Sequence, residues 1–397
     1  MIKRFFGKPF AEFTQRQEAS GIILITCTVL SLILSNVIWS EKYLLLLNYN
    51  FDFFVAGAHL HSSPVHFIND ALMAVFFLLV GLEIKRELIS GELSTISKAS
   101  LPVAAALGGM IVPALIYAGI NMPHDSLNGW GIPMATDIAF ALGVLSLLGK
   151  RVPLSLKVLL TALAVVDDLG TIVIIALFYT KHISAFYLLM SVTVMMVLYL
   201  MNYFGINKLR WYIIPAMLLW VCIYLSGVHA TIAGVLLALF IPLQTGNKKS
   251  LLLRLEHMLH KPVNFIIMPL FALVNTAIVF DGNLLDLFNA PLGAGVIAGL
   301  VLGKPIGISV FVWLAVKLGL SQLPEGVSLK KIIGVGFLGG IGFTMSIFIS
   351  LLAFEDEGYI TLSKISIMIA SLIAGIIGYA ILRLQPYVSS VNQIEEK

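Results

Sequence analysis

The amino-acid sequence predicts an all-α polytopic membrane protein with twelve transmembrane helices. The chain has 397 residues, of which 59% are hydrophobic and only 12% are charged, and its mean hydropathy is +0.98. Soluble proteins carry about 25% charged residues, so this composition excludes an ordinary soluble domain. The apolar runs reach 18 or more residues, whereas a membrane β-barrel would show short alternating segments. The spans are therefore expected to be helices.

The whole chain, residues 1–397, is interpreted as a single transmembrane domain. Its first apolar run begins near Ser20 and lacks a small-residue cleavage pattern, which favours a retained span over a signal peptide. Residues 1–17 and 386–397 are expected to be a cytoplasmic N-terminus and a cytoplasmic tail. The twelve spans are centred near residues 27, 77, 110, 138, 167, 194, 217, 236, 266, 305, 341 and 373.

The distribution of lysine and arginine predicts the orientation of these spans. If both termini are cytoplasmic, 21 of the 25 basic residues fall on the inner side. The outer segments then hold only Lys42, Lys181 and Lys364, while Lys304 lies within the tenth span. Basic residues concentrate in cytoplasmic loops, so this alternation supports both the orientation and the number of spans.

Residues 37–64 form the long outer loop that follows from this orientation. Within the loop, residues 51–61 place Gly57 between extended-looking residues, which is a weak signal for a β-hairpin. An ordered loop without a partner is an equally good interpretation of the same residues.

Two adjacent aspartates, Asp167 and Asp168, lie at the middle of the apolar run from about Leu154 to Tyr179. A charged side chain at the centre of a bilayer costs at least about 2.5 to 3.5 kcal/mol on insertion scales. Such a pair is tolerated only beside a water-filled path, a counter-charge or a bound cation, so it is a candidate site. Successive residues of a helix point about 100° apart, which predicts different partners for the two carboxylates.

Two spans contain residues that interrupt a continuous helix. In the fourth span, residues 128–137 combine Gly129, Gly131 and Pro133 with Asp137. The eleventh span contains a dense run of glycines: Gly334, Gly336, Gly339, Gly340 and Gly342. Each glycine destabilises a helix by about 1 kcal/mol relative to alanine. Either interruption alone is also compatible with close helix packing through small residues.

The two interrupted spans occupy matching places in the chain. Each is the middle of three consecutive spans, spans 3–5 and spans 10–12, and the two triplets begin on opposite sides of the membrane. This arrangement is typical of inverted-topology repeats whose interrupted helices cross near the midplane, at a binding site. Unwound helices leave partial charges at their ends, which Asp137 and Lys304 are suited to offset.

Six stretches extend over almost the whole chain: NDALMAVFFLLVGLE at 69–83, ATDIAFALG at 135–143, VDDLG at 166–170, SGVHAT at 226–231, GKP at 303–305 and GIGFTMS at 340–346. In content and order they resemble the NhaA-type sodium/proton antiporter family, which is itself a standard example of inverted repeats. The resemblance implies a transporter in the bacterial inner membrane that exchanges cytoplasmic Na⁺ or Li⁺ for external H⁺. It also implies that the proton gradient drives the exchange, and that the exchange is electrogenic and regulated by pH.

The resemblance carries roles to individual residues. It implies that Asp168 is the main ligand of the transported Na⁺ and of the proton, with Asp167 as its neighbour and Lys304 as the counter-charge of Asp167 in one state. It places Thr136 and Asp137 beside the crossing of the interrupted helices, as further contributors to the cation and proton site. Residues 51–61 resemble the family's outer hairpin, which implies a homodimer through that segment.

The residue types themselves suit cation/proton exchange. A carboxylate holds either a proton or a small hard cation, so competition at one site couples the two without any cofactor. Oxygen ligands suit Na⁺ or Li⁺, and Asp167, Asp168 and Lys304 are expected to titrate as one coupled unit. The expected partners are therefore Na⁺, Li⁺ and H⁺ as substrates and the lipid bilayer as surroundings, with no nucleic acid.

Two charged clusters lie at the inner ends of spans and are candidates for pH regulation: Glu83, Lys85, Arg86 and Glu87, and Arg254, Glu256, His257 and His260. Because both clusters lie on the inner side, they are expected to line one inward funnel. Histidine titrates near neutrality, so this funnel is expected to respond to pH. His229 resembles a family position linked to pH response, and Leu253 stands where the family pattern has a basic residue. Ordinary solvated helix ends, and a packing role for His229, are the alternatives.

Three other functions fit the sequence less well. A cation-coupled symporter for an organic solute would need a roomier site, with a buried arginine or an aromatic cluster for the solute. An intramembrane aspartyl protease needs two aspartates that share one water, normally from separate helices, whereas Asp167 and Asp168 are adjacent. A silent sensor would keep the fold without turnover, but the chain retains the acidic and basic residues expected of the site. The sequence therefore favours a transporter over an enzyme.

Overall fold

The computed structural model of the chain describes residues 18–38, 40–49, 51–55, 58–180, 183–243, 250–279 and 290–385. The expected N-terminal segment 1–17, the expected tail 386–397 and the turn of the expected hairpin at residues 56–57 lie outside these described residues. The described chain is predominantly helical. Helices satisfy their own backbone hydrogen bonds, which is what lipid requires of a membrane-spanning segment.

Eight helical stretches of the described residues are long and apolar enough to cross a membrane. Those formed by a single helix are α6 (Ile96–Asn121), α8 (Leu154–Phe178), α9 (Ala185–Tyr203) and α19 (Glu357–Leu384). The others continue through a π-helical turn: α2 (Glu18–Ile33) with η1 (Leu34–Ile38), α4 (Pro64–Phe67) with η2 (Ile68–Leu72) and α5 (Met73–Ser90), α12 (Leu251–Pro262) with η5 (Val263–Ile267) and α13 (Met268–Asn275), and α15 (Pro291–Ala298) with η6 (Gly299–Gly303) and α16 (Lys304–Lys317). The chain is therefore a multi-pass membrane protein.

Two pairs of helices reach the length of a span only when they are taken together. The 3₁₀-helix η3 (Asp125–Met134) is bent by 45° from α7 (Ile138–Leu147). In the same way, α17 (Leu329–Gly339) is bent by 49° from α18 (Phe343–Ala353). These pairs cover the fourth and eleventh predicted spans, and counting each pair as one span gives up to ten spans among the described residues.

Two predicted spans correspond to shorter helices. α10 (Leu209–Leu225) has 17 residues and α11 (Ile232–Phe240) has 9. A helix rises about 1.5 Å per residue, so α11 alone reaches less than half of a hydrocarbon core of about 30 Å. The membrane-spanning helical architecture is confirmed, while the number of twelve spans and the inverted-topology repeats stay predictions.

The chain divides into two compact units, and each is assembled from segments that lie far apart in the sequence. The first unit comprises residues 1–22, 95–168 and 283–397, and the second comprises residues 23–94 and 169–282. The division falls inside α8, directly after Asp168. Neither unit therefore corresponds to one continuous piece of the chain.

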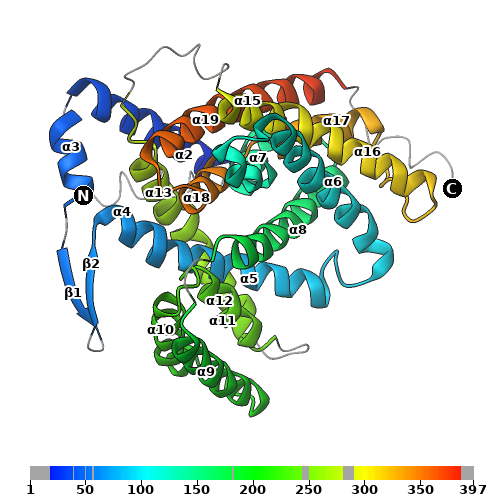
Figure 1. Cartoon of the computed structure of the whole chain (residues 1–397). Helices are drawn as coiled ribbons and strands as arrows, with labels where there is room; N and C mark the ends of the chain where they lie inside the picture. Colours follow the sequence, from blue (N-terminus) through cyan, green and yellow to red (C-terminus); the bar gives the residue numbers. More distant parts are fainter. Residues whose placement is uncertain are drawn as a thin grey trace, which may run out of the picture. The chain divides into compact units, whose positions relative to one another are not determined.

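Within the first unit, α16 packs along α6 and against α17, and α17 runs beside α19 (Figure 1). The contact of α6 with α16 depends on glycine, because a Cβ on Gly108 would collide with the backbone of Gly307, and the reverse holds for Gly307. Gly334 and Gly336 of α17 likewise leave room for the neighbouring helices α19 and α16. These last two glycines lie within a continuous helix, so they serve close packing rather than interruption.

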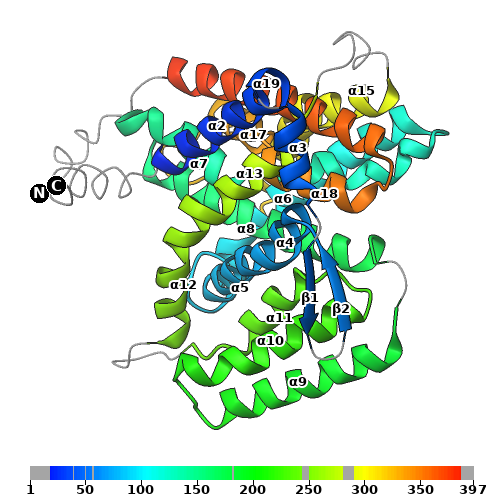
Figure 2. The ribbon, with the colours of Figure 1, turned by 90° about the vertical axis from the view of Figure 1, so that its left-hand side faces the viewer.

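Within the second unit, α5 packs against α11 and α12, and α9 lies beside α10 (Figures 1 and 2). The side chains between these helices are mainly aliphatic. They form one buried cluster that includes Leu82, Leu219, Leu237 and Leu252.

The second unit also contains the described strands. β1 (Phe51–Val55) and β2 (Ala58–Ser62) pair antiparallel, with Phe53 opposite Leu60 (Figure 2). They follow the short helix α3 (Ser40–Leu47), in the segment where the glycine-centred pattern predicts a hairpin. The placement of this hairpin on the outer side of the membrane stays a prediction.

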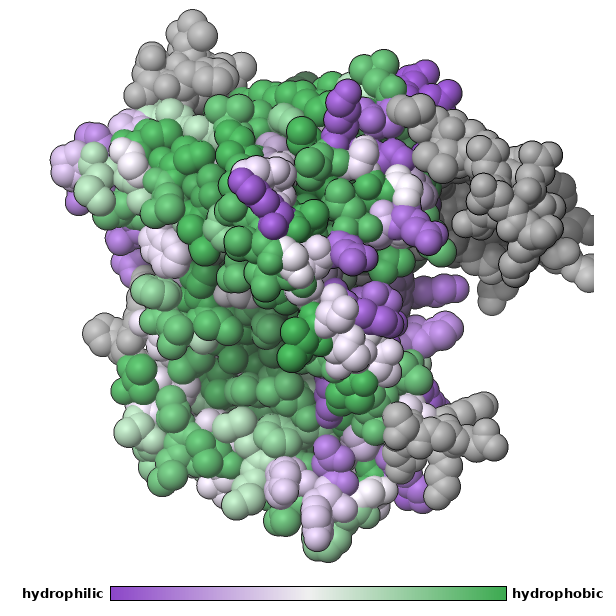
Figure 3. Space-filling model, turned by 90° about the vertical axis from the view of Figure 1, so that its right-hand side faces the viewer, coloured by the Kyte–Doolittle hydropathy of each residue, from purple (hydrophilic) through white to green (hydrophobic). Residues whose placement is uncertain are grey.

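The exposed surface is rich in apolar residues. Such residues cover much of the face shown in Figure 3, and hydrophilic residues form smaller groups on it. α9 is a clear example, because only 11% of its most apolar stretch is buried and Phe186, Leu189 and Met196 are largely exposed. Apolar surface of this extent is expected of helices that face lipid.

Candidate functional site

Two unwound segments cross in the first unit. Residues 135–137 separate η3 from α7, and residues 340–342 separate α17 from α18. Asp137 donates its backbone N–H to the carbonyl of Ile341 over 2.7 Å, and Thr136 Oγ1 donates to the carbonyl of Gly339 over 2.9 Å. The two segments therefore supply each other with backbone partners at a depth where lipid offers none.

The first break lies slightly later in the sequence than its glycine and proline residues suggest. Gly131 and Pro133 lie inside the 3₁₀-helix η3, and the unwound segment itself follows at residues 135–137. Proline lacks the N–H of a helical hydrogen bond and glycine lowers α-helix propensity, which disfavours a regular α-helix in this half-span. In the second break, Gly339 is the last residue of α17, and Gly340 and Gly342 lie in the unwound segment.

Asp137 connects the starts of two half-helices. Its Oδ1 accepts the backbone N–H of Phe140 over 2.9 Å and so caps the N-terminus of α7. Its Oδ2 accepts the backbone N–H of Thr344 over 3.2 Å and the Thr344 hydroxyl over 2.5 Å, at the start of α18. Helix N-termini carry partial positive charge, so this buried carboxylate offsets two of them at once.

Lys304 and Asp167 form a fully buried ion pair. Lys304 Nζ lies 2.6 Å from Asp167 Oδ2, and the two side chains are 0% and 1% exposed. The same ammonium donates to Thr136 Oγ1. Lys304 is the first residue of α16, directly after the π-helical turn η6, and Asp167 lies near the middle of α8. The pair therefore joins α16 and α8 to the first unwound segment.

Asp168 adds a second carboxylate to this group. It is 1% exposed and interacts electrostatically with Lys304. One ammonium thus faces two carboxylates, so the group carries a net negative charge when all three are ionised. Asp167 Oδ1 is buried and has no hydrogen-bond partner among the described residues. A negative, oxygen-lined position in an apolar interior suits a proton or a small hard cation.

Carboxylates alone do not complete a cation site here. Among the described residues, no group of three or more His, Cys, Asp or Glu side chains is arranged to hold a metal ion. A cation bound by Asp167 and Asp168 would therefore need hydroxyl or carbonyl oxygens as further ligands. Thr136 Oγ1 is a candidate for such a ligand, because it accepts a hydrogen bond from Lys304, which also bonds Asp167.

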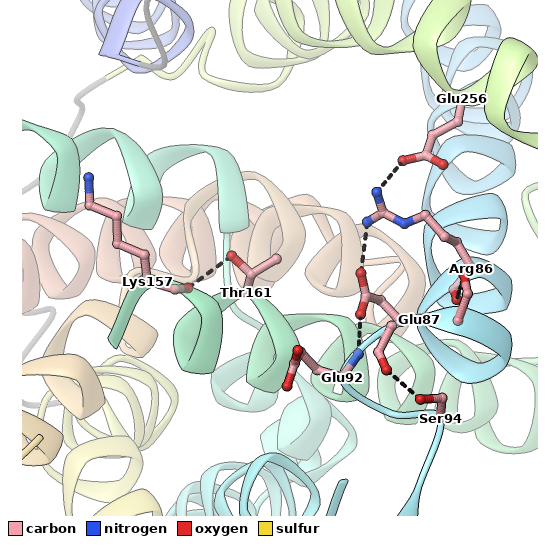
Figure 4. A network of polar contacts seen from close by, with 9 residues as sticks. Arg86, Glu87, Glu92, Ser94, Lys157, Thr161 and Glu256 are labelled. Carbon is pink, nitrogen blue, oxygen red and sulfur yellow. Dashed lines mark hydrogen bonds and ion pairs between the residues drawn. The ribbon is translucent and has the colours of Figure 1, made fainter. Parts of the chain in front are cut away.

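A second polar cluster lies in the second unit, between α5 and α12 (Figure 4). Arg86 donates to Glu87 Oε1 over 2.8 Å and lies 3.0 Å from Glu256 Oε1 on α12. Glu87 also accepts the backbone N–H of Glu92 over 2.9 Å. Glu83, one turn before Glu87, interacts electrostatically with Arg86 and with Glu256. Arg86 thus links the two charged clusters that the sequence places at inner helix ends.

Lys85, although it precedes Arg86, has different surroundings. Its ammonium donates to the carbonyls of Leu239 and Ile241, each over 2.6 Å. These carbonyls end α11, so Lys85 caps the C-terminus of that short helix, where a positive charge is favourable. Its contacts are therefore those of a structural residue.

The histidines of the predicted clusters differ in their contacts. His229 Nε2 lies 3.0 Å from the carbonyl oxygen of Tyr179. His257 and His260 are exposed on α12, and Asn264 contacts His260 over 3.1 Å. Arg254, on the same helix, is exposed as well.

Two hydroxyl residues without a predicted role also lie at the crossing. Thr344 contacts Asp137, as described above, and Ser346 Oγ donates to the carbonyl of Ile132 near the end of η3 over 2.7 Å. Both follow the second break within the GIGFTMS stretch. Their position directly after the glycine run could have indicated a role at the crossing. A broken helix leaves backbone groups without partners, and nearby hydroxyls can bond them.

Comparison with known proteins gives a consistent result. The profile of the family described as Na⁺/H⁺ antiporter 1 matches residues 11–382. The Na(+)/H(+) antiporter NhaA 2 of Flavobacterium johnsoniae is 50% identical over 383 residues, which cover 96% of this chain and 94% of the relative. The Na(+)/H(+) antiporter NhaA of Escherichia coli is 47% identical over 382 residues, which cover 95% of this chain and 98% of the relative.

A relative from a third bacterium is similar over a comparable length. The Na(+)/H(+) antiporter NhaA 1 of Clostridium beijerinckii is 45% identical over 388 residues, which cover 96% of this chain and 97% of the relative. The family profile extends over both unwound segments and over the charged residues of both clusters described above. The chain therefore belongs to the Na⁺/H⁺ antiporter 1 family.

Proposed function

We propose that this chain exchanges Na⁺ or Li⁺ for H⁺ across the membrane. The observation that carries the proposal is the buried group of Asp167, Asp168 and Lys304 beside the crossing of two unwound segments. Such a group persists in an apolar protein only when it has partners, and intramembrane carboxylates of this kind mark ion and proton paths. Family membership supports the same activity and a transporter rather than an enzyme.

Exchange follows from competition for the two carboxylates. A cation or a proton that reaches Asp168 reduces the negative charge that faces Lys304. A cation that takes both oxygens of Asp167 replaces Lys304 at Oδ2, so this mode of cation binding is coupled to release of the lysine. When the cation leaves, protons and the lysine take back the same oxygens. The site therefore holds either the cation or protons, and this exclusivity is what an exchanger needs.

The coupling is expected to be electrogenic. Two carboxylates and one lysine titrate as a unit, so more than one proton can leave for each monovalent cation that binds. The inward proton gradient then drives the export of Na⁺ or Li⁺. The aspartyl protease is not supported, because both oxygens of Asp137 are bonded to helix ends and Asp167 is bonded to Lys304.

The proposed topology has twelve spans with both termini cytoplasmic, in a bacterial inner membrane. The distribution of basic residues and the bacterial relatives support it. The two bent helix pairs hold corresponding places in spans 3–5 and 10–12, which supports inverted-topology repeats. The proposed homodimer uses residues 51–61, where the paired strands β1 and β2 offer edges for further pairing.

Regulation by pH is assigned to the cluster around Arg86. Its bonds to Glu87 and Glu256 join α5 to α12, and Glu83 lies close enough to share the positive charge. Loss of charge on any of these carboxylates would weaken the link between the two helices. We include His257, which is exposed on α12, and His229, whose Nε2 lies 3.0 Å from the carbonyl oxygen of Tyr179, in the proposed regulation.

Purified protein in proteoliposomes with an imposed pH gradient tests the proposed exchange. Added Na⁺ or Li⁺ is expected to collapse the gradient with the intact protein and not with Asp168→Asn, because an amide cannot trade a proton for a cation. Asp125→Asn is the matched control, since Asp125 is an exposed acid at the start of η3. It should behave like the intact protein.

Two results would contradict the proposal. Equal collapse by the intact protein and by Asp168→Asn would exclude this carboxylate from the exchange. No collapse by the intact protein at any pH would exclude the exchange itself, and a collapse that required an organic solute would favour a symporter.

A further inference from the structure

The ends of the half-helices at the crossing are each bonded to a side chain. Asp137 accepts N–H groups at the starts of α7 and α18, and Thr136 donates to the last carbonyl of α17. The end of η3 is bonded by Ser346, whose Oγ donates to the carbonyl of Ile132 over 2.7 Å. Ser346 and Ile132 are 0% exposed, so water has no access to this carbonyl. Ser346 is the residue of this set to which the transport mechanism gives no role.

Gly342 is fitted to Ser346. A Cβ added to Gly342 would collide with Ser346 Oγ and approach the side chain of Leu300. The backbone of Gly342 has φ −87° and ψ −27°, which any L-residue can adopt. The glycine is therefore required for space and not for its conformation. The space that it leaves is where the Ser346 hydroxyl lies.

The bond between Ser346 and Ile132 joins α18 to η3 close to the two breaks. Ile132 precedes Thr136 by one helical turn, and Ser346 follows Thr344 in the first turn of α18. A shift of η3 along α18 would thus move Thr136 relative to Gly339 and Asp137 relative to Thr344. The hydrogen bond from Ser346 to Ile132 opposes that shift.

We propose that Ser346 is a positioning residue of the cation site, and that Gly342 lacks a side chain in order to leave room for the Ser346 hydroxyl. The inference rests on the proposed exchange function. Ser346 touches no cation ligand directly, and it acts by fixing the end of η3 and therefore the place of Thr136 and Asp137. Its loss should weaken apparent cation binding more than it slows turnover.

The first experiment compares single variants in proteoliposomes. Ser346→Ala is expected to raise the apparent KM for Na⁺ about tenfold, because it leaves the buried Ile132 carbonyl without a partner, while the maximal rate changes less than threefold. Ser346→Thr keeps a hydroxyl and should restore much of the lost affinity. Ser350→Ala is the matched control: Ser350 is equally buried on α18, but its hydroxyl bonds Ile347 within its own helix. Its KM should match that of the intact protein.

The second experiment is a double-mutant cycle. Gly342→Ala should raise the KM for Na⁺ as Ser346→Ala does, because its Cβ displaces the same hydroxyl. The double variant Gly342→Ala with Ser346→Ala should then have a KM no higher than that of either single variant. The hydroxyl that the new Cβ would displace is already absent from it. Independent, multiplicative effects on KM would overturn the link between the two residues.

Other results would overturn the role of Ser346 itself. These are an unchanged KM in Ser346→Ala, an equal rise in Ser350→Ala, or a loss of maximal rate and thermal stability without a change in KM. Failure of the proposed exchange would give a different result. In that case the intact protein itself would show no Na⁺-dependent collapse of the gradient.

Discussion

Lys304 illustrates how one residue can be both costly and necessary. Its side chain is 0% exposed, and it is held by Asp167 and Thr136. Removing a charge pair from water costs several kcal/mol, so a buried pair by itself is weak evidence for stability. Removing only one partner is different, because the other charge then stays buried without compensation.

Lys304→Met is therefore expected to destabilise the protein by about 3 to 5 kcal/mol, through the uncompensated Asp167 carboxylate. Thermal unfolding of the purified protein in detergent measures this as a lower Tm. The control is Lys317→Met, because Lys317 is an exposed lysine at the end of the same helix. The double variant Lys304→Met with Asp167→Leu should recover most of the lost Tm. If Lys304→Met unfolds like the control, the ion pair does not exist in the purified protein.

The charges of the site could be predicted from the sequence, and Thr136 from the family resemblance, whereas the hydroxyls of Thr344 and Ser346 were not predicted. Asp167, Asp168 and Lys304 are conspicuous, because charges within long apolar runs have few structural explanations. Thr344 and Ser346 are inconspicuous, because serine and threonine are common in membrane helices and usually bond a carbonyl of their own helix. Only the packing of α18 against η3 shows that their partners lie elsewhere.

At the scale of helices, composition predicts that a span is interrupted better than it predicts where. The fourth span bends at residues 135–137, after its glycine and proline residues, which lie within the 3₁₀-helix η3. The eleventh span bends within its glycine run, but Gly334 and Gly336 stay helical because neighbouring helices pack on them. Propensity identifies weak points, and tertiary contacts decide which of them unwinds.

The link between α5 and α12 leads to a prediction about pH. Replacing Glu256 by Gln together with His257 by Ala should move the pH at which exchange reaches half its maximum, because Arg86 loses its partner on α12. The apparent KM for Na⁺ at the pH of full activity should stay similar, since this cluster is not part of the cation site. The measurement is a series of pH-gradient assays across the activity range.

Lys85→Met is the matched comparison for that prediction. Lys85 neighbours Arg86 on α5 but bonds only carbonyls at the end of α11 among the contacts described. Its replacement should lower Tm slightly and leave the pH midpoint unchanged. A pH midpoint that moves with Lys85→Met but not with the Glu256 variant would reverse the roles assigned to these two residues.

At the scale of the whole molecule, the sequence predicts segments but not how they are grouped. Long apolar runs identify the spans, since length and hydropathy are local properties. The division into two units depends on contacts between distant segments such as α6 and α16, which no local pattern encodes. Short helices such as α11 are also hard to assign, because tertiary packing and capping sustain a helix that length alone would not.

The orientation of the chain yields a prediction that separates a true span from a re-entrant loop. Cys27 and Cys222 are first replaced by Ala, and single cysteines are then introduced at exposed loop residues. Glu325, between α16 and α17, should react with a membrane-impermeant maleimide only from the inner side, because it flanks the basic residues Lys330 and Lys331. Glu355, between α18 and α19, should react only from the outer side. If both cysteines react from the same side, α17 and α18 form a re-entrant loop, and the twelve-span topology with its inverted repeats is wrong.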